Sequence, residues 1–200
     1  PQLLTKVSED FLWAAQQCKD RGYEEVNLNL GCPSGTVVAK GKGSGMLRDL
    51  GSLEKFLDEI FAGAPLPISV KCRLGLENPE EFPALLELLN RYPIRELTLH
   101  PRVRKAFYKG DVNMEMFRYC VENSKNPVCY NGNLSSLEDI SAAIARSGGW
   151  LGQAKEILEE NADSARLTAF AESFCRRDTM GLMQVLVPME KWKREILIPE

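Results

Sequence analysis

Residues 27–34 read Asn27-Leu28-Asn29-Leu30-Gly31-Cys32-Pro33-Ser34, and this stretch decides the fold. Together with Val26, its apolar residues alternate with asparagines, which predicts a short strand with one row buried against helices and amides on its other face. Gly31 and Pro33 are turn-forming residues on either side of Cys32. The Cys32 thiol therefore stands where a strand passes into a loop, a position suited to chemistry, although free cysteines more often belong to the core.

The segment that follows, residues 40–45, is rich in glycine and contains Lys40 and Lys42. Such a segment lets backbone amides and cations approach an anion. Its glycines lack the spacing of a P-loop, so by themselves they are a weak signal.

Composition limits the classes of protein to consider. The chain has 200 residues, 44% of them hydrophobic, which suits one globular domain with a small appendage. Its formal net charge is -3, so any nucleic-acid surface must be a local patch. Six cysteines without a CxxC pair, and one histidine, argue against a metal site and for reduced thiols in a cytoplasmic protein. No segment reaches the roughly 18 apolar residues of a membrane span, and no signal peptide opens the chain.

The alternating pattern of residues 26–30 returns three times, at residues 68–75, 97–102 and 127–131, with amphipathic segments between. We expect Ser8 and Ser52 to cap the first two helices. Strands that alternate with helices at intervals of roughly 30 residues predict right-handed βαβ units and a parallel sheet.

Polar side chains fall at the carboxyl ends of the predicted strands, in the row opposite the apolar residues: Asn29, Lys71, His100 and Asn131. Taken singly, each has an ordinary structural interpretation. Four in the same phase favour a TIM (β/α)8-type barrel, in which this row points inward at the active-site face. A doubly wound open sheet, which would also gather them at one edge, is the second choice.

The loop from residue 102 to residue 110 mixes cations with Phe107 and Tyr108. Its cations are Arg102, Arg104, Lys105 and Lys109. Such a run is commonly a solvated face, and it also fits contacts to a nucleic-acid substrate. Residues 151–200 read as helices without strands, so we expect a helical RNA-binding appendage after a barrel portion in residues 1–150, with cations between Arg176 and Arg194.

These motifs resemble, in order and spacing, those of the tRNA-dihydrouridine synthase family. The matching pieces lie within residues 2–134 and are 27–33, 70–75, 99–102 with 107–110, and 131–133. The resemblance implies FMN at the top of a TIM barrel, a helical domain for tRNA, and reduction of the uridine C5=C6 bond with NADPH or NADH as electron source.

The resemblance also implies roles for individual residues. Cys32 matches the proton donor to C5, while the reduced flavin N5 delivers hydride to C6; an ordinary thiol is mostly protonated at neutral pH, which suits an acid. The matches to flavin-holding positions are Gln2, Lys71 and His100, those to the loop beside the flavin phosphate are Asn131, Gly132 and Asn133, and those near the target uracil are Asn29 and Arg73.

Two departures from the family pattern leave other interpretations open. The first strands are missing, so we expect further sequence upstream of Pro1, and residues 148–153 replace the usual Gly-Arg phosphate segment. The alternatives are an FMN barrel oxidoreductase that acts on a free pyrimidine and a flavin-less RNA-binding relative. The sequence does not define an oligomeric state, and we favour a monomer.

Overall fold

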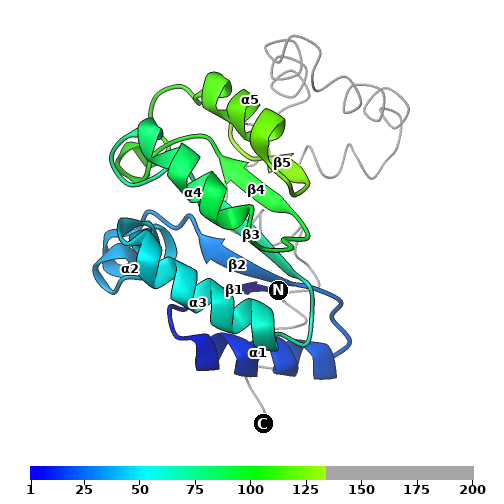
Figure 1. Cartoon of the computed structure of the whole chain (residues 1–200). Coiled ribbons are helices and arrows are strands. Elements are labelled where there is room, and N and C mark those ends of the chain that lie inside the picture. Colours follow the sequence, from blue (N-terminus) through cyan, green and yellow to red (C-terminus); the bar gives the residue numbers. More distant parts are fainter. Residues whose placement is uncertain (134–200) are drawn as a thin grey trace, which may run out of the picture. The chain divides into compact units, whose positions relative to one another are not determined.

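A computed structural model of the chain describes residues 1–133, of which residues 1–132 form one compact unit. It contains one sheet of five parallel strands in the order β1-β2-β3-β4-β5 (Figure 1). The strands are β1 (Gln2–Leu3), β2 (Val26–Leu30), β3 (Ile68–Arg73), β4 (Leu97–His100) and β5 (Val128–Tyr130).

Helices connect these strands and contact one another in chain order, α1 with α3, α3 with α4, and α4 with α5. Their bounds are α1 (Ser8–Asp20), α2 (Gly35–Ala39), α3 (Leu50–Gly63), α4 (Phe82–Leu89) and α5 (Met114–Asn123), with 3₁₀ turns η1 (Gly43–Arg48), η2 (Pro79–Glu81) and η3 (Arg104–Ala106). Figure 1 shows α1, α3 and α4 side by side along one face of the sheet.

This strand order decides between the two folds that the sequence left open. In a doubly wound sheet the order reverses at a switch point and helices cover both faces. Here the strands follow one another without reversal, as the strands of a βα barrel do. The predicted α/β barrel fold is confirmed, and the described residues supply five of its strands.

The core lies between the sheet and its helices. On the helix side of the strands, Leu28, Val70 and Leu99 are fully buried, as are helical residues such as Phe11 and Leu57. Burying a side chain of this size stabilises the fold by about 1.5–3 kcal/mol. The opposite row of each strand is consequently left for polar residues, as the alternation in residues 26–30 predicted.

Two helix starts differ from the prediction. Asp49, not Ser52, caps α3, because its Oδ1 accepts from the backbone N–H groups of Gly51 (3.0 Å) and Ser52 (3.2 Å). Ser8 lies inside α1, whose N-cap is Val7, and its hydroxyl hydrogen-bonds the Glu59 carboxylate instead.

Several expectations concern parts of the chain outside the described residues: the helical appendage, the boundary at residues 150/151, the segment 148–153 and the cations from Arg176 to Arg194. In the part that the structure does describe, no helix has the length and apolar character to cross a membrane. Within residues 1–133 all five cysteines are free thiols, and no group of three or more His, Cys, Asp or Glu side chains could hold a metal ion.

Candidate active site

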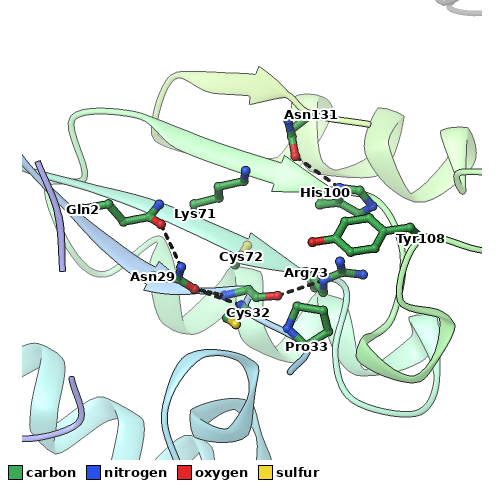
Figure 2. Close-up of a pocket in the computed structure, with 11 residues that line it drawn as sticks. Gln2, Asn29, Cys32, Pro33, Lys71, Cys72, Arg73, His100, Tyr108 and Asn131 are labelled. Carbon is green, nitrogen blue, oxygen red and sulfur yellow. Dashed lines mark hydrogen bonds between the residues drawn. The ribbon is translucent and has the colours of Figure 1, made fainter. Parts of the chain in front are cut away.

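A cavity of about 230 Å³ opens at the carboxyl ends of the strands (Figure 2). It is lined by Gln2, Asn29, Gly31, Cys32, Pro33, Lys71, Cys72, Arg73, His100, Tyr108 and Asn131. The structure therefore brings together Cys32, Asn29, Arg73 and four of the six residues predicted to hold a flavin. The cavity is smaller than the roughly 300–1,000 Å³ of a complete ligand pocket, so these residues form one part of a site.

Strand register explains why residues far apart in the sequence meet here. Asn29 is paired with Lys71 across β2 and β3, and Arg73 with His100 across β3 and β4. Because side chains alternate between the two faces of a strand, paired residues of neighbouring parallel strands point to the same face. The polar row predicted from the sequence thus becomes one wall of the cavity.

The backbone of Cys32 is fixed on both sides of the residue. Its N–H donates to Asn29 Oδ1 (2.9 Å), which also accepts from the Gly31 N–H (3.0 Å). Its carbonyl accepts from the Ser44 hydroxyl (2.8 Å). A Cβ on Gly43 would lie 2.8 Å from the Cys32 Cβ, so the glycine-rich segment packs directly behind the thiol.

A row of side-chain amides, which we call the amide ladder, holds Asn29 in turn. The ladder consists of Ser69, Asn27, Gln2 and Asn29. Asn27 Nδ2 donates to Ser69 Oγ (2.8 Å), Gln2 Nε2 to Asn27 Oδ1 (2.7 Å), and Asn29 Nδ2 to Gln2 Oε1 (2.8 Å). Gln2, predicted to hold the flavin, lines the cavity with an amide that already bonds both asparagines.

Arg73 joins the Cys32 turn to the loop after β4, although it is only 2% exposed. Its Nε donates to the Gly31 carbonyl (2.9 Å), and its Nη1 donates to the carbonyls of Phe107 (2.7 Å) and Val103 (3.3 Å). The guanidinium also lies 5.2 Å from the centre of the Tyr108 ring.

Lys71 is a cation of the cavity that forms no hydrogen bond or ion pair with the described residues. Its ammonium has no hydrogen-bond or ion-pair partner among residues 1–133, and burial, with Arg73 nearby, lowers its pKa. A half-buried cation of this kind favours an electron-rich ligand atom. The donor here, an ammonium beside side-chain amides, fits the N1/C2=O edge of a flavin ring.

His100 is 6% exposed and bonded at both ring nitrogens. Nδ1 lies 3.1 Å from Asn131 Oδ1, and Nε2 lies 3.1 Å from Arg102 Nη1. Burial, opposed by the Asn131 hydrogen bond and reinforced by the cations Arg73, Arg102 and Lys71, lowers the pKa of His100 to about 4. The imidazole is therefore neutral at physiological pH.

Arg102 was predicted to belong to a surface patch of cations, but the structure buries it. It is 3% exposed, and its Nη2 donates to the Gly110 carbonyl (2.5 Å), so its guanidinium closes the loop from inside and does not lie on the surface. Arg104 is half-buried, while Lys105 and Lys109 are exposed. The loop rests on the loop after β3, since the Arg104 N–H donates to the Gly75 carbonyl (2.8 Å).

Tyr108 was not predicted as a site residue, yet its ring lies 6.0 Å from that of His100, edge to face. The chain reverses just before it, where Phe107 takes a left-handed conformation (φ 51°). The loop motif marked the segment as unusual, but nothing in the residue order indicates which of its side chains lies beside His100.

Gly132 and Asn133 do not line this cavity. Gly132 is buried, and a Cβ there would lie 3.0 Å from Val112 Cγ1, so close packing explains the glycine. Asn133 is exposed.

Parallel strands in sequential order, with helices outside and polar side chains gathered at the carboxyl edge, define the class of βα-barrel proteins that bind ligands at this face. The family model described as "Dihydrouridine synthase (Dus)" matches residues 2–150. The chain belongs to the dihydrouridine synthase family.

Curated relatives agree with this assignment. A "Probable tRNA-dihydrouridine synthase" of Rickettsia prowazekii is 32% identical over 136 residues, which are 68% of this chain and 42% of the relative. "Probable tRNA-dihydrouridine synthase 1" of Synechocystis is 30% identical over 136 residues, 68% of this chain and 38% of the relative. A Staphylococcus aureus relative is 32% identical over 132 residues, 66% and 40% respectively. The chain thus spans about two fifths of the length of these relatives.

Proposed function

We propose that this chain carries the flavin-binding and catalytic part of an enzyme that reduces the C5=C6 bond of uridine in tRNA to dihydrouridine. FMN is the cofactor, NADPH or NADH the electron source, and the cytoplasm the site of action. The observation that carries the proposal is the convergence of three groups on a cavity at the barrel edge, in a chain of this family. These are the Cys32 thiol, the Lys71 ammonium, which has no partner among residues 1–133, and the neutral His100 imidazole.

The proposed division of labour follows from the contacts. When bound, reduced FMN supplies the hydride that adds to C6. Lys71 would stabilise negative charge on the cofactor, because its ammonium has no partner among residues 1–133. The Cys32 thiol gives a proton to C5, so that hydride and proton together saturate the bond. Asn29 and Arg73 hold the backbone of the Cys32 turn, through Cys32 N–H and Gly31 C=O, and keep the thiol in place.

An RNA substrate is favoured over a free pyrimidine by the loop beside the cavity. Tyr108 is 70% exposed, Phe107 is also exposed, and Lys105 and Lys109 flank them at the surface. Exposed aromatic rings among cations suit stacked bases and phosphates. A free base would need neither. A uridine in folded tRNA must also be unstacked to enter, which costs a few kcal/mol that such contacts offset.

The test separates the half-reactions in Cys32→Ala. We expect the variant to bind FMN and to accept electrons from NADPH or NADH like the unaltered chain, while dihydrouridine formation in tRNA is lost. Cys18→Ala, which removes a buried thiol on α1, is the matched control and keeps both half-reactions.

Dihydrouridine formation at the normal rate by Cys32→Ala would contradict the role of the thiol. Failure of the unaltered chain to bind FMN would favour the flavin-less RNA-binding relative, and reduction of free uracil in preference to tRNA would favour the small-pyrimidine oxidoreductase.

A further inference from the structure

Arg102 and His100 form a buried contact whose chemistry admits one assignment. A guanidinium carries five N–H donors and no acceptor, so it can only donate. The His100 Nε2 atom, 3.1 Å from Arg102 Nη1, must therefore accept, and it carries no proton. The neutral imidazole then holds its proton on Nδ1.

The protonation of His100 also determines which atom of the Asn131 amide faces it. A protonated Nδ1 donates, so the atom of Asn131 that faces it at 3.1 Å must be the amide oxygen. Arg102 therefore fixes the amide orientation of Asn131 through one imidazole, because a flipped amide would present a donor to the Nδ1–H donor. Both His100 and Asn131 line the cavity.

The surroundings of His100 support the same state. Lys71 and Arg73 are further cations on the same side, and a protonated imidazole would add another positive charge in a buried place. Arg102 itself is held by the Gly110 carbonyl at its other end, so the guanidinium cannot turn away without opening the loop that carries Tyr108.

We propose that Arg102 is a positioning residue of this site. By donating to Nε2 it holds His100 as the neutral tautomer with the proton on Nδ1, and through His100 it sets the orientation of the Asn131 amide that the cavity presents to a ligand. The consequence for FMN rests on the proposed function, whereas the tautomer does not.

The sequence makes the tautomer directly measurable, because it contains a single histidine. Nitrogen-15 NMR of the full chain at neutral pH therefore reports one imidazole. We expect an unprotonated Nε2 and a protonated Nδ1. A protonated Nε2 in the unaltered chain would overturn the proposal, whatever the variants do.

Variants assign the cause. Arg102→Met removes the donor, and we expect the Nε2-protonated tautomer to appear, while Arg102→Lys, which keeps a donor without acceptors, retains the original form. Arg118→Met, which removes an exposed arginine on α5, is the matched control and leaves the signal unchanged. Should Arg102→Met fail to fold, Asn131→Ala decides: the tautomer persists if Arg102 sets it and changes if Asn131 does, which would overturn the proposal.

FMN titration provides the second arm. We expect Arg102→Met to weaken FMN binding about tenfold, the effect of losing one well-placed hydrogen bond, and Arg118→Met to leave it unchanged. Unchanged FMN affinity in an Arg102→Met variant with an altered tautomer would overturn the positioning role. Absence of FMN binding by the unaltered chain contradicts the proposed cofactor, and the tautomer still decides whether Arg102 sets the state of His100.

Discussion

The charged side chain of Lys71 is half-buried, whereas the ammonium group of a lysine is normally solvated. Its ammonium is half-buried without a partner among residues 1–133, and burial lowers its pKa, which means that the charged form destabilises the fold. We expect Lys71→Met to raise the free energy of unfolding by about 1 kcal/mol and to weaken FMN binding at the same time. Chemical denaturation and FMN titration measure the two effects.

The exposed Lys125 provides the control for this prediction, since Lys125→Met should change neither quantity. If Lys71→Met binds and reduces FMN like the unaltered chain, the cation has no part in holding the cofactor.

His100 makes stability depend on pH in a defined window. Its pKa falls from an ordinary 6.5 to about 4 in the folded protein, so the unfolded chain binds the extra proton between these values. The contribution of His100 to the free energy of unfolding is therefore fully present above pH 6.5. It is lost as the pH falls toward 4, by about 3 kcal/mol in all. The charged groups that face the ring are Lys71 and Arg73 from β3 and Arg102 from the following loop.

Urea denaturation at pH 7 and pH 5 tests this, with His100→Gln as the comparison. We expect the loss of stability between the two pH values to shrink in the variant. Asp49 and Glu81 also have lowered pKa values, but the ordinary pKa of a carboxyl lies below pH 5, so these groups contribute little between the two pH values compared. Equal losses in both proteins would mean that the imidazole does not carry the effect.

At the scale of elements, the loop from Arg102 to Gly110 is a preformed surface. Arg73 bonds its carbonyls at Val103 and Phe107, and backbone bonds tie it to the loop after β3. Neutralising its outward cations should therefore remove charge without moving the loop. We expect Arg104→Gln, Lys105→Gln and Lys109→Gln together to weaken tRNA binding and to lower the magnitude of its salt slope by up to about three.

Electron transfer from NADPH to FMN should be unaffected in this triple variant, which serves as the internal control. The Lys105 contribution is the smallest, because its ammonium already lies 3.6 Å from the exposed Glu77 carboxylate. A triple variant with unaltered affinity and salt slope would make the loop an ordinary solvated face.

Elements also differ in how far the sequence predicts them. The strand around Asn27 and Asn29 was predicted correctly because alternation of period two fixes which side chains share a face. The cap of α3 was not, because Ser52 and Asp49 are both good caps three residues apart. Arg102 was misplaced for a similar reason, since a run of cations has the same pattern whether a guanidinium points outward or inward.

At the scale of the molecule, residues 1–132 form one compact unit with a buried core, and two aromatic residues of α1 test how that core is built. Phe11 is fully buried while Trp13 is 68% exposed. We expect Phe11→Ala to lower the free energy of unfolding by about 3–5 kcal/mol, and Trp13→Ala to change it by less than about 0.5 kcal/mol. Similar losses for both variants, measured by denaturation, would mean that Trp13 is covered in solution.

The choice between barrel and open sheet is also a property of the whole molecule, and strand phase favoured the barrel without excluding the open sheet. In both folds, the carboxyl ends of the strands that carry Lys71 and His100 lie at the same edge of the sheet. Only the pairing of β1 to β2 to β3, in order and without a switch point, separates them. The candidate site was easier to predict than its internal bonds, because strand phase gathers Asn29 and Lys71 whereas hydrogen-bond partners depend on loop geometry.

Because of the amide ladder, the position of Cys32 should not depend on salt concentration or pH. Its members, Ser69, Asn27, Gln2 and Asn29, carry no net charge and no group that gains or loses a proton in the physiological range. Added salt, which weakens contacts to phosphates, does not loosen bonds between neutral amides. Acidity that would charge His100 leaves them intact. The thiol is thus held by uncharged side chains that do not ionise, while the charged groups around it respond to ionic strength and pH.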